Sequence, residues 1–434
     1  MAPLPSITIP GAPEQSPGGA MTPKLFSMLR HEAYGLNALK RDVSAGLTVA
    51  VIALPISMAI AIASGATPDR GLYTAIAGGF VVSALGGSRF QIGGPAAAFI
   101  VIIASIIERH GMQGLMTATL MAGAFMMIAG WLRLGTYIRL IPHAVITGFT
   151  AAIAVIIFAS QIKDLLGLTL AGREPAALIA KLGALIPALG SVSVQAIAIS
   201  VISLAAILLT SRFKPAWPAL LIGVAAGTLA AALFGLNAET IGSRFGGIPN
   251  ALPAPALPDL SWPQLLKMLP DALAITLLGG IESLLSAVVA DVMTNRSHRP
   301  NAELVAQGLA NIASPVFGGI PVTGTIARTA ANIRSNAYGP VSGILHAVFL
   351  LAFMMAAAPM AKHIPLAALG AVLTVTAWNM ADKPQLRLIL TEQRGPALVL
   401  LVTFLLTIFR DLIEGIAAGV IASLALALLK RWQR

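Results

Sequence analysis

Two stretches of the sequence decide the fold: GGSRFQIGGPAAA at residues 86–98 and GGIPVTGTIARTA at residues 318–330. Each one follows an apolar run, opens with a Gly-Gly pair and continues through a few extended residues. Each then reaches another glycine, Gly94 or Gly324, which opens a short apolar segment. This shared layout predicts that the chain contains two related halves. A chance coincidence of Gly and Pro breaks is the alternative.

The composition around these stretches is that of a membrane protein. The 434 residues are 57% hydrophobic and 10% charged, and the mean hydropathy is +0.86, whereas soluble domains carry about 25% charged residues. Apolar runs follow one another from Val43 to the C-terminus, and a run of about 20 residues is long enough to cross a bilayer. The sequence therefore predicts an all-α polytopic membrane protein.

Several function classes are excluded or disfavoured by composition. The chain has no cysteine and only six scattered histidines, so we expect no disulfide, no thiolate chemistry, no metal centre and no cofactor. Its net charge of +11 is spread over short loops and forms no single basic face, which argues against a nucleic-acid partner. The positive charge is interpreted as a topology signal.

Fourteen membrane spans are predicted from the apolar runs and their Gly, Pro and charge breaks. An even number places both termini on one side, and roughly two thirds of the 28 Lys and Arg residues lie on that side, which the positive-inside rule makes cytoplasmic. The predicted spans are 43–64, 71–87, 95–108, 113–133, 142–162, 192–210, 216–235, 270–291, 302–317, 325–335, 340–360, 364–381, 395–410 and 411–430.

The domain organisation follows from this count. We expect a cytoplasmic N-terminal tail at 1–40, whose first 23 residues read as disordered. A first repeat follows at 41–235, then a loop at 236–269 and a second repeat at 270–434. Because seven is odd, the second repeat is inverted relative to the first. The spans at 95–108 and 325–335 and the final pair, which shares the break Arg410–Asp411, are short for a hydrocarbon core of about 30 Å.

Short interrupted helices that begin inside the membrane favour an anion site. A helix N-terminus exposes unpaired N–H groups and about half a positive charge. Pro95 suits the first helical turn, and Gly94 lets a ligand approach the backbone closely. We predict that the N–H groups of Ala96 and Thr325 hold an anion, with Arg328 one turn further on. A plain turn at Gly94, and an Arg328 that pairs with Glu282 or extends to the interface, are the alternatives.

Other polar and kinked positions carry further predictions. Glu282 lies within an apolar run with Ser286 one turn on, so it is a candidate for binding H⁺ or Na⁺; a structural carboxylate is the alternative. Ile56 and Ile60 share one helix face beside Pro55, either lining a cavity or packing. Asp291 is expected to cap a helix or pair with Arg296 or Arg299, His143 to lie at an interface, and His346 to pack.

The sequence resembles the SulP anion permeases, the solute carrier family 26 group. The matching stretches are the two quoted above with AGLTVAVIALPISMAIAIASG (45–65), LLGGIESLLSAVVAD (277–291) and DLIEGIAAGVIASL (411–424). They occur in the family's order over nearly the whole folded chain. The resemblance implies a 7+7 inverted repeat with core and gate domains, in which half-helices 3 and 10 meet mid-membrane and the core moves like an elevator.

The resemblance also implies a set of site residues. The substrate would contact Ile56, Ile60, Gly94, Pro95, Ala96, Gly324, Thr325, Ile326 and Ala327, with Arg328 just behind. Glu282 and Ser286 match positions that couple transport to H⁺ or Na⁺ in prokaryotic relatives, which implies Na⁺ near Glu282, Ser286, Gly324 and Ile326. A polar residue and an aromatic residue of the family are replaced here by Ile56 and Ala96, so the pocket mouth is roomier and more apolar.

The expected function is secondary active transport of small anions, of the sulfate, bicarbonate or dicarboxylate class, coupled to H⁺ or Na⁺. An anion channel of the same architecture and a purine/pyrimidine-type permease are alternatives. A membrane enzyme is disfavoured because the spans offer no nucleophile with a base. We expect a bacterial inner membrane location, membrane lipid around the chain and no STAS domain before Arg434. Whether the protein forms a homodimer is left open.

Overall fold

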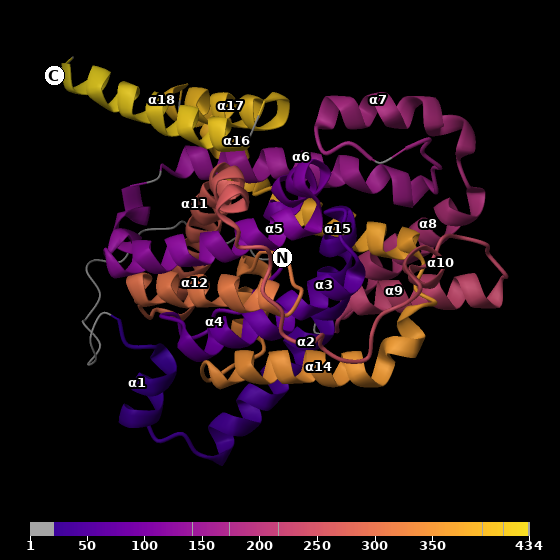
Figure 1. The fold of residues 1–434 in the computed structure, drawn as a ribbon, viewed down its shortest axis with the longest axis horizontal. Helices are drawn as coiled ribbons and strands as arrows, with labels where there is room; N and C mark the ends of the chain where they lie inside the picture. Colours follow the sequence, from indigo (N-terminus) through magenta and orange to yellow (C-terminus); the bar gives the residue numbers. More distant parts are fainter. Residues whose placement is uncertain are drawn as a thin grey trace.

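The computed structural model describes residues 21–140, 142–172, 174–215, 217–392, 394–410 and 412–432. In Figure 1 most of the long helices run across the picture, with α1 (Lys24–His31) at the left and α10 (Ile241–Phe245) at the right. Within the described residues, six helices are long and apolar enough to cross a membrane, and several shorter apolar helices pack beside them. The protein is an all-α polytopic membrane protein.

A first helix group surrounds the two interrupted segments. Within it α5 packs against α11 and α12, and α14 packs against α2 and α4. The group contains α2 (Leu36–Ala63), α3 (Pro68–Tyr73), the π-helical turn η1 (Thr74–Gly78), α4 (Gly79–Leu85), the short 3-10 helix η2 (Ala97–Phe99), α5 (Ile100–Trp131), the 3-10 helix η3 (Leu134–Leu140), α11 (Trp262–Thr294), α12 (Pro300–Val316), α13 (Ile326–Arg334) and α14 (Val341–Ala361).

A second helix group packs on one side of the first. Within it α6 lies against α15 and α17, α8 against α9, and α17 against α18. The two groups meet mainly where α2 packs on α9 and α15. Besides α10, the second group contains α6 (His143–Leu166), α7 (Leu178–Ala188), the short 3-10 helix η4 (Leu189–Ser191), α8 (Val194–Phe213), α9 (Ala219–Leu233), α15 (Leu366–Met380), α16 (Lys383–Glu392), α17 (Arg394–Phe409) and α18 (Leu412–Trp432).

The helix α5 is two helices joined at Gly111, whose φ of 65° and ψ of −174° are not helical. A Cβ placed on Gly279 of α11 would meet both Phe99 and Met126. These two residues lie on opposite sides of Gly111 in the sequence, yet they contact the same point on α11. The chain therefore turns back at Gly111, as the separate predictions at 95–108 and 113–133 required.

The predicted spans agree with the observed helices to within a few residues at most ends, although the count of fourteen is not established by the structure. The sequence did not predict α7 or α16, which are short helices in the links after α6 and α15. Helix α1 lies within the predicted tail 1–40. Residues 1–20 of that tail, Asp411 of the final break and the terminal Arg434 lie outside the described residues.

Exposed tryptophans lie near both ends of the long helices, as is typical of residues at membrane interfaces. Trp131, Trp217 and Trp378 lie at the end that carries α1, which we call the proximal end, and Trp262 lies at the opposite, distal end. Helix α2 begins at the proximal end and finishes at the distal end. These ends serve below to locate the site and its surroundings.

The segment around α1 is tied to the proximal end of the first helix group. Glu32 forms an ion pair with Arg89. The Oε2 atom of Glu32 accepts a hydrogen bond from Arg89 Nη2 at 2.7 Å and another from Tyr338 Oη at 2.8 Å. The hydrogen bonds from Arg89 are the main reason that the pKa of the Glu32 carboxyl falls from 4.5 to about 2. Arg89 precedes one interrupted segment and Tyr338 follows the other, so Glu32 bridges both.

Glu32→Gln is expected to lower the melting temperature of the purified protein at neutral pH. A carboxyl whose pKa is depressed by folding stabilises the folded state above its ordinary pKa and loses that effect as pH falls through the folded value. The difference from wild type should therefore shrink as pH falls from 4.5 toward 2. Glu414→Gln, at an exposed ion pair, is the control; equal melting at neutral pH would contradict a stabilising bridge.

Candidate functional site

The two interrupted segments pair with each other in the middle of the first helix group. Strand β1 (Gly93–Gly94) runs antiparallel to β2 (Thr323–Gly324), with Gly93 opposite Gly324 and Gly94 opposite Thr323. Directly after these strands the chain enters η2 and α13. The pairing therefore brings the N-terminal ends of two short helices, far apart in sequence, next to each other.

Buried polar side chains hold the extended backbone that leads into β2. Asn311 Nδ2 donates to Val322 O at 2.7 Å, and Val322 N donates to Asn311 Oδ1 at 3.0 Å. Ile320 N donates to Thr74 Oγ1 at 2.7 Å. A backbone segment buried away from other strands needs such partners for its N–H and C=O groups. These side chains explain how an extended segment exists inside a helical protein.

Neither helix N-terminus carries a capping side chain: Ala96 precedes η2 and Thr325 precedes α13 without a side-chain cap bond. The prediction that the Thr325 N–H holds the anion is wrong, because this group donates to Ile92 O at 3.0 Å. The first-turn N–H groups of Ile326 and Ala327 have no partner within the helix and are the donors that α13 offers. The role assigned to the Ala96 N–H stays a prediction.

Arg328 reaches from α13 to the other interrupted segment. Its side chain is 2% exposed, and its Nη2 donates to Ser57 Oγ of α2 at 3.1 Å and to Pro95 O at 3.4 Å. Nη1 has no hydrogen-bond partner among the described residues. Neither alternative for Arg328 holds, because it is buried and no ion pair joins it to Glu282 in the described part of the chain. A buried guanidinium with an unused donor favours an anionic ligand.

Each of the two interrupted segments has a glycine that leaves room for a polar side chain from the other segment. A Cβ on Gly94 would overlap Arg328 Nη1, and a Cβ on Gly324 would overlap Gln91 Nε2. Gln91 donates to Ser283 O at 3.1 Å, and its buried Oε1 has no partner in the part of the chain that the structure describes. The sequence prediction missed Gln91. A polar residue three positions before Gly94, within an apolar stretch, was the available signal.

Glu282 and Ser286 lie on α11 beside α13, and their surroundings differ. Glu282 is half-buried, and its Oε2 has no partner among the described residues. Ser286 is fully buried and donates to Thr329 Oγ1 at 3.2 Å, which also accepts from Ile92 N. The alternative that ties Glu282 to Arg328 therefore fails. A carboxylate held without a counter-charge in this setting can receive a cation or a proton.

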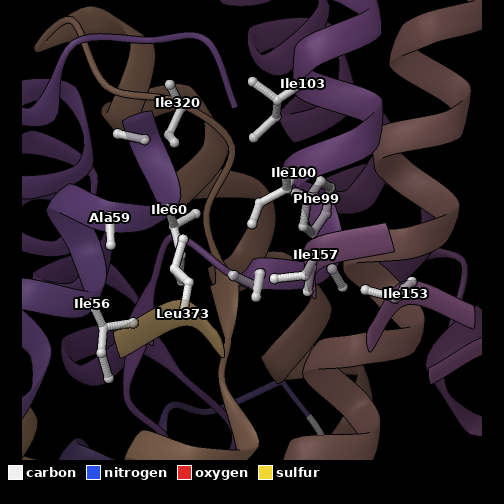
Figure 2. Packing of buried hydrophobic residues seen from close by; sticks show 14 of the residues in the cluster. Ile56, Ala59, Ile60, Phe99, Ile100, Ile103, Ile153, Ile157, Ile320 and Leu373 are labelled. Atoms are coloured by element: carbon white, nitrogen blue, oxygen red, sulfur yellow. The ribbon is translucent and has the colours of Figure 1, made fainter. Parts of the chain in front are cut away.

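Ile56 and Ile60 of α2 lie in one apolar cluster at the junction of the two helix groups. Figure 2 shows them with Phe99 of η2, Ile100 of α5, Ile153 and Ile157 of α6 and Leu373 of α15. Both isoleucines are buried, as is Ala96, whereas Ile326 is 41% exposed and Ala327 is exposed too. One side of the paired N-termini is thus packed with apolar side chains and the other is open.

The distal side of this junction is closed. Ala59, Ile62 and Ala63 of α2 face Leu369 and Leu373 of α15, and the space between them has no room for a water molecule. We call this contact the distal seam. Because Ala59 precedes Ile60, the seam lies directly on the distal side of the apolar cluster that packs beside the paired N-termini.

The remaining polar predictions have mixed outcomes. Asp291 forms the expected loop ion pair, but with His298: its Oδ2 lies 2.6 Å from His298 Nδ1 and also accepts from His298 N at 3.0 Å. His143 is exposed at the start of α6, and His346 is fully buried in α14, as expected. Both ring nitrogens of His346 lack hydrogen-bond partners among the described residues. None of these side chains joins the site.

Comparison with known proteins identifies the family. A family profile described as the sulfate permease family matches residues 39–403. The chain belongs to the sulfate permease family. Because that family consists of anion transporters, the protein is a membrane transporter and not an enzyme. The resemblance drawn from the motifs is confirmed.

Two bacterial relatives within the family are similar over most of this chain. The protein named "Putative sulfate transporter YvdB" of Bacillus subtilis is 42% identical over 90% of this chain and 74% of its own length. The bicarbonate transporter BicA of Picosynechococcus is 31% identical over 88% of this chain and 69% of its own length. The names of these two sulfate permease relatives refer to a divalent oxyanion, sulfate, and a monovalent one, bicarbonate.

Solved structures carry the same fold. The transmembrane domain of a cyanobacterial bicarbonate transporter BicA matches with a TM-score of 0.79 at 32% identity, over 88% of this chain and 98% of that one. The structure of SLC26A9 matches with a TM-score of 0.84 over 95% of this chain and 68% of that one, at 18% identity, which shows the fold alone. The predicted fold class of this sulfate permease family member is confirmed.

Proposed function

We propose that the protein is a secondary active transporter of small oxyanions, of the sulfate, bicarbonate or dicarboxylate class. The observation that carries this proposal is the meeting of two uncapped helix N-termini, joined by β1 and β2, with Arg328 between them. Two partial positive charges and one full positive charge converge on one point. The named activities of the relatives support the same ligand class.

Coupling to H⁺ or Na⁺ is proposed through Glu282. Its carboxylate lies beside α13, and its Oε2 has no partner among the residues that the structure describes. A cation bound there would lie close enough to the anion site to favour occupation of both. Ser286, Gly324 and Ile326 surround this position in the proposed Na⁺ site.

We propose that alternating access occurs by movement of the first helix group against the second. In this proposal the first group is the core domain and the second is the gate domain. The two halves of the sequence are proposed to be inverted repeats. The exposed Ile326 and Ala327 and the closed distal seam favour a state open toward the proximal end. The closed seam also favours a carrier over a channel, since a channel needs a continuous water path. We propose that the proximal end is cytoplasmic, in a bacterial plasma membrane, and that the protein forms a homodimer.

Uptake of radiolabelled sulfate, bicarbonate and chloride into proteoliposomes tests the function. Saturable uptake of an oxyanion that rises with an inward H⁺ or Na⁺ gradient is the expected result. Currents far above a carrier's turnover would instead favour the channel. Uptake that uracil inhibits and that no anion affects would favour the purine/pyrimidine-type permease.

Arg328→Ala is expected to weaken the apparent affinity for sulfate more than that for bicarbonate or chloride. The Coulomb energy of the lost interaction scales with the charge of the anion. The measurement is the ratio of the KM values for sulfate and bicarbonate in wild type, Arg328→Ala and Arg328→Lys. An unchanged ratio together with lower expression of Arg328→Ala would mean that the guanidinium serves packing alone.

A further inference from the structure

A separate cavity of about 420 Å³ lies at the distal end, entirely within the second helix group. It is enclosed by the end of α6, the start of α8, the link before α10, and the start of α15. Its polar lining includes Lys163, Asp164, Ser193, Asn237, Glu239 and Arg244. Neither the sequence motifs nor the paired helix N-termini account for this cavity.

Arg244 is the group in this cavity best suited to an anion. Its Nη1 lies 3.4 Å from Asp164 Oδ1 and 3.8 Å from Glu239 Oε2, so both pairings are long. A guanidinium has five N–H donors, and the bond to Asp164 is the one hydrogen bond that the Arg244 guanidinium makes among the described residues. The guanidinium also lies over the Phe245 ring, 5.4 Å from its centroid. Most of its donors are therefore free for a ligand in the cavity.

Backbone hydrogen bonds fix the segment that carries Arg244. Ile241 N donates to Ile364 O at 2.9 Å, and Gly242 N donates to Lys362 O at 2.8 Å. Leu366 N donates to the backbone oxygen of Glu239 at 2.9 Å. These bonds attach α10 to the link between α14 and α15. Because this backbone is already ordered, binding at Arg244 carries a smaller entropic cost for ordering the protein.

The charges in the cavity are balanced, with Lys163 and Arg244 against Asp164 and Glu239. The N-terminal ends of α8 and α15 also face the cavity and add partial positive charge, while the C-terminal end of α6 opposes them. An anion would therefore bind by replacing a carboxylate on Arg244. Such an exchange suits capture followed by release, because the carboxylate can return to the arginine.

The cavity adjoins the distal seam. Asp164 and Leu366 line both the cavity and the seam. Beyond the seam, one residue from Ala59, lies Ile60 of the apolar cluster beside the paired helix N-termini. Asp164 thus lies where the cavity meets the seam, on the side of the cavity nearest to the proposed anion site.

We propose that this cavity is a capture site for a small oxyanion on the distal side of the membrane. Arg244 binds the oxyanion in place of Asp164, and the returning Asp164 carboxylate favours passage of the anion toward the seam. The forked guanidinium matches two oxygens of a sulfate or bicarbonate ion and favours these over a halide. This proposal rests on the proposed transport of oxyanions through the paired helix N-termini.

Side-specific kinetics test the capture site. Uptake of radiolabelled sulfate and bicarbonate is measured in whole cells, where the distal side faces the medium, and in inside-out membrane vesicles. Arg244→Gln should raise the KM in cells roughly tenfold, the effect of losing a charge-assisted hydrogen bond at a partly exposed site, and leave the KM in vesicles unchanged. Glu239→Gln should lower the KM in cells, since it removes a competitor for Arg244.

Arg212→Gln is the matched control, because Arg212 is exposed at the proximal end of α8. It should leave the KM in cells unchanged. An equal rise in both preparations, or a lower maximal rate at constant KM in Arg244→Gln, would overturn the capture site. Arg244→Lys, which keeps the charge and loses the fork, should show an intermediate KM even if Arg244→Gln does not fold. A wild type without oxyanion uptake would refute the proposed function itself.

Discussion

Gly324→Ala should nearly abolish transport while the protein still folds. The added methyl group would occupy the position of the Gln91 amide, beside the strand pair that holds both helix N-termini. Overpacking of a filled site costs about 1–3 kcal/mol, and about 1.4 kcal/mol is a factor of ten in an equilibrium. We therefore expect uptake to fall roughly tenfold, with a normal monodisperse profile in detergent.

The double variant Gln91→Ala with Gly324→Ala separates steric conflict from other causes. Removing the Gln91 side chain creates space for the new methyl group, so the double variant should recover part of the lost uptake. Gly183→Ala in α7 is the control, since a Cβ there meets no atom within 4 Å. Wild-type uptake by Gly324→Ala, or a double variant no better than the single one, would contradict the packing described for these residues.

Glu282→Gln should remove the dependence of uptake on the H⁺ or Na⁺ gradient. Glutamine keeps the size of the side chain but can neither accept a proton nor neutralise a sodium ion. Exchange of anion across the membrane should continue, because the paired N-termini and Arg328 are unchanged. The measurement is uptake into proteoliposomes with and without an inward gradient, compared with anion exchange at equilibrium.

Glu108→Gln provides the matched control for this variant, since Glu108 is exposed near the Gly111 turn of α5. It should keep the full gradient dependence. If Glu282→Gln kept that dependence as well, Glu282 would be a structural carboxylate. If both exchange and concentrative uptake disappeared with normal folding, the residue would serve the anion site directly.

The fold was largely predictable because membrane insertion leaves a strong pattern in the sequence. Runs such as 45–65 are apolar on all sides, and Gly-Gly breaks at residues 86–87 and 318–319 mark where helices end. The turn at Gly111 was found because charged residues interrupt the run there. Helices α7 and α16 were missed, since both are too short to resemble a span and lie in links between spans.

The site was predictable at the level of residues but less so at the level of atoms. The meeting of the segments that begin at Gly94 and Gly324 was predicted from matching positions in the two halves. The pairing of Gly94 with Thr323 and the hydrogen bond from Thr325 N to Ile92 O depend on strand register. Register is set by the burial of Asn311 and Thr74, which are distant in sequence. Gln91 was missed because its side chain packs against Gly324, and this contact forms only when the two halves of the sequence come together in the fold.

Thiol labelling offers the most direct test of the central claim that an anion binds between the two helix N-termini. The chain contains no cysteine, so Ala327→Cys is the single target for a membrane-impermeant thiol reagent. The control is Ser211→Cys, at an exposed position at the proximal end of α8. We predict that sulfate or bicarbonate slows labelling at position 327, from the proximal side, and leaves position 211 unaffected. Labelling of Ala327→Cys at a rate that neither anion changes would contradict the claim.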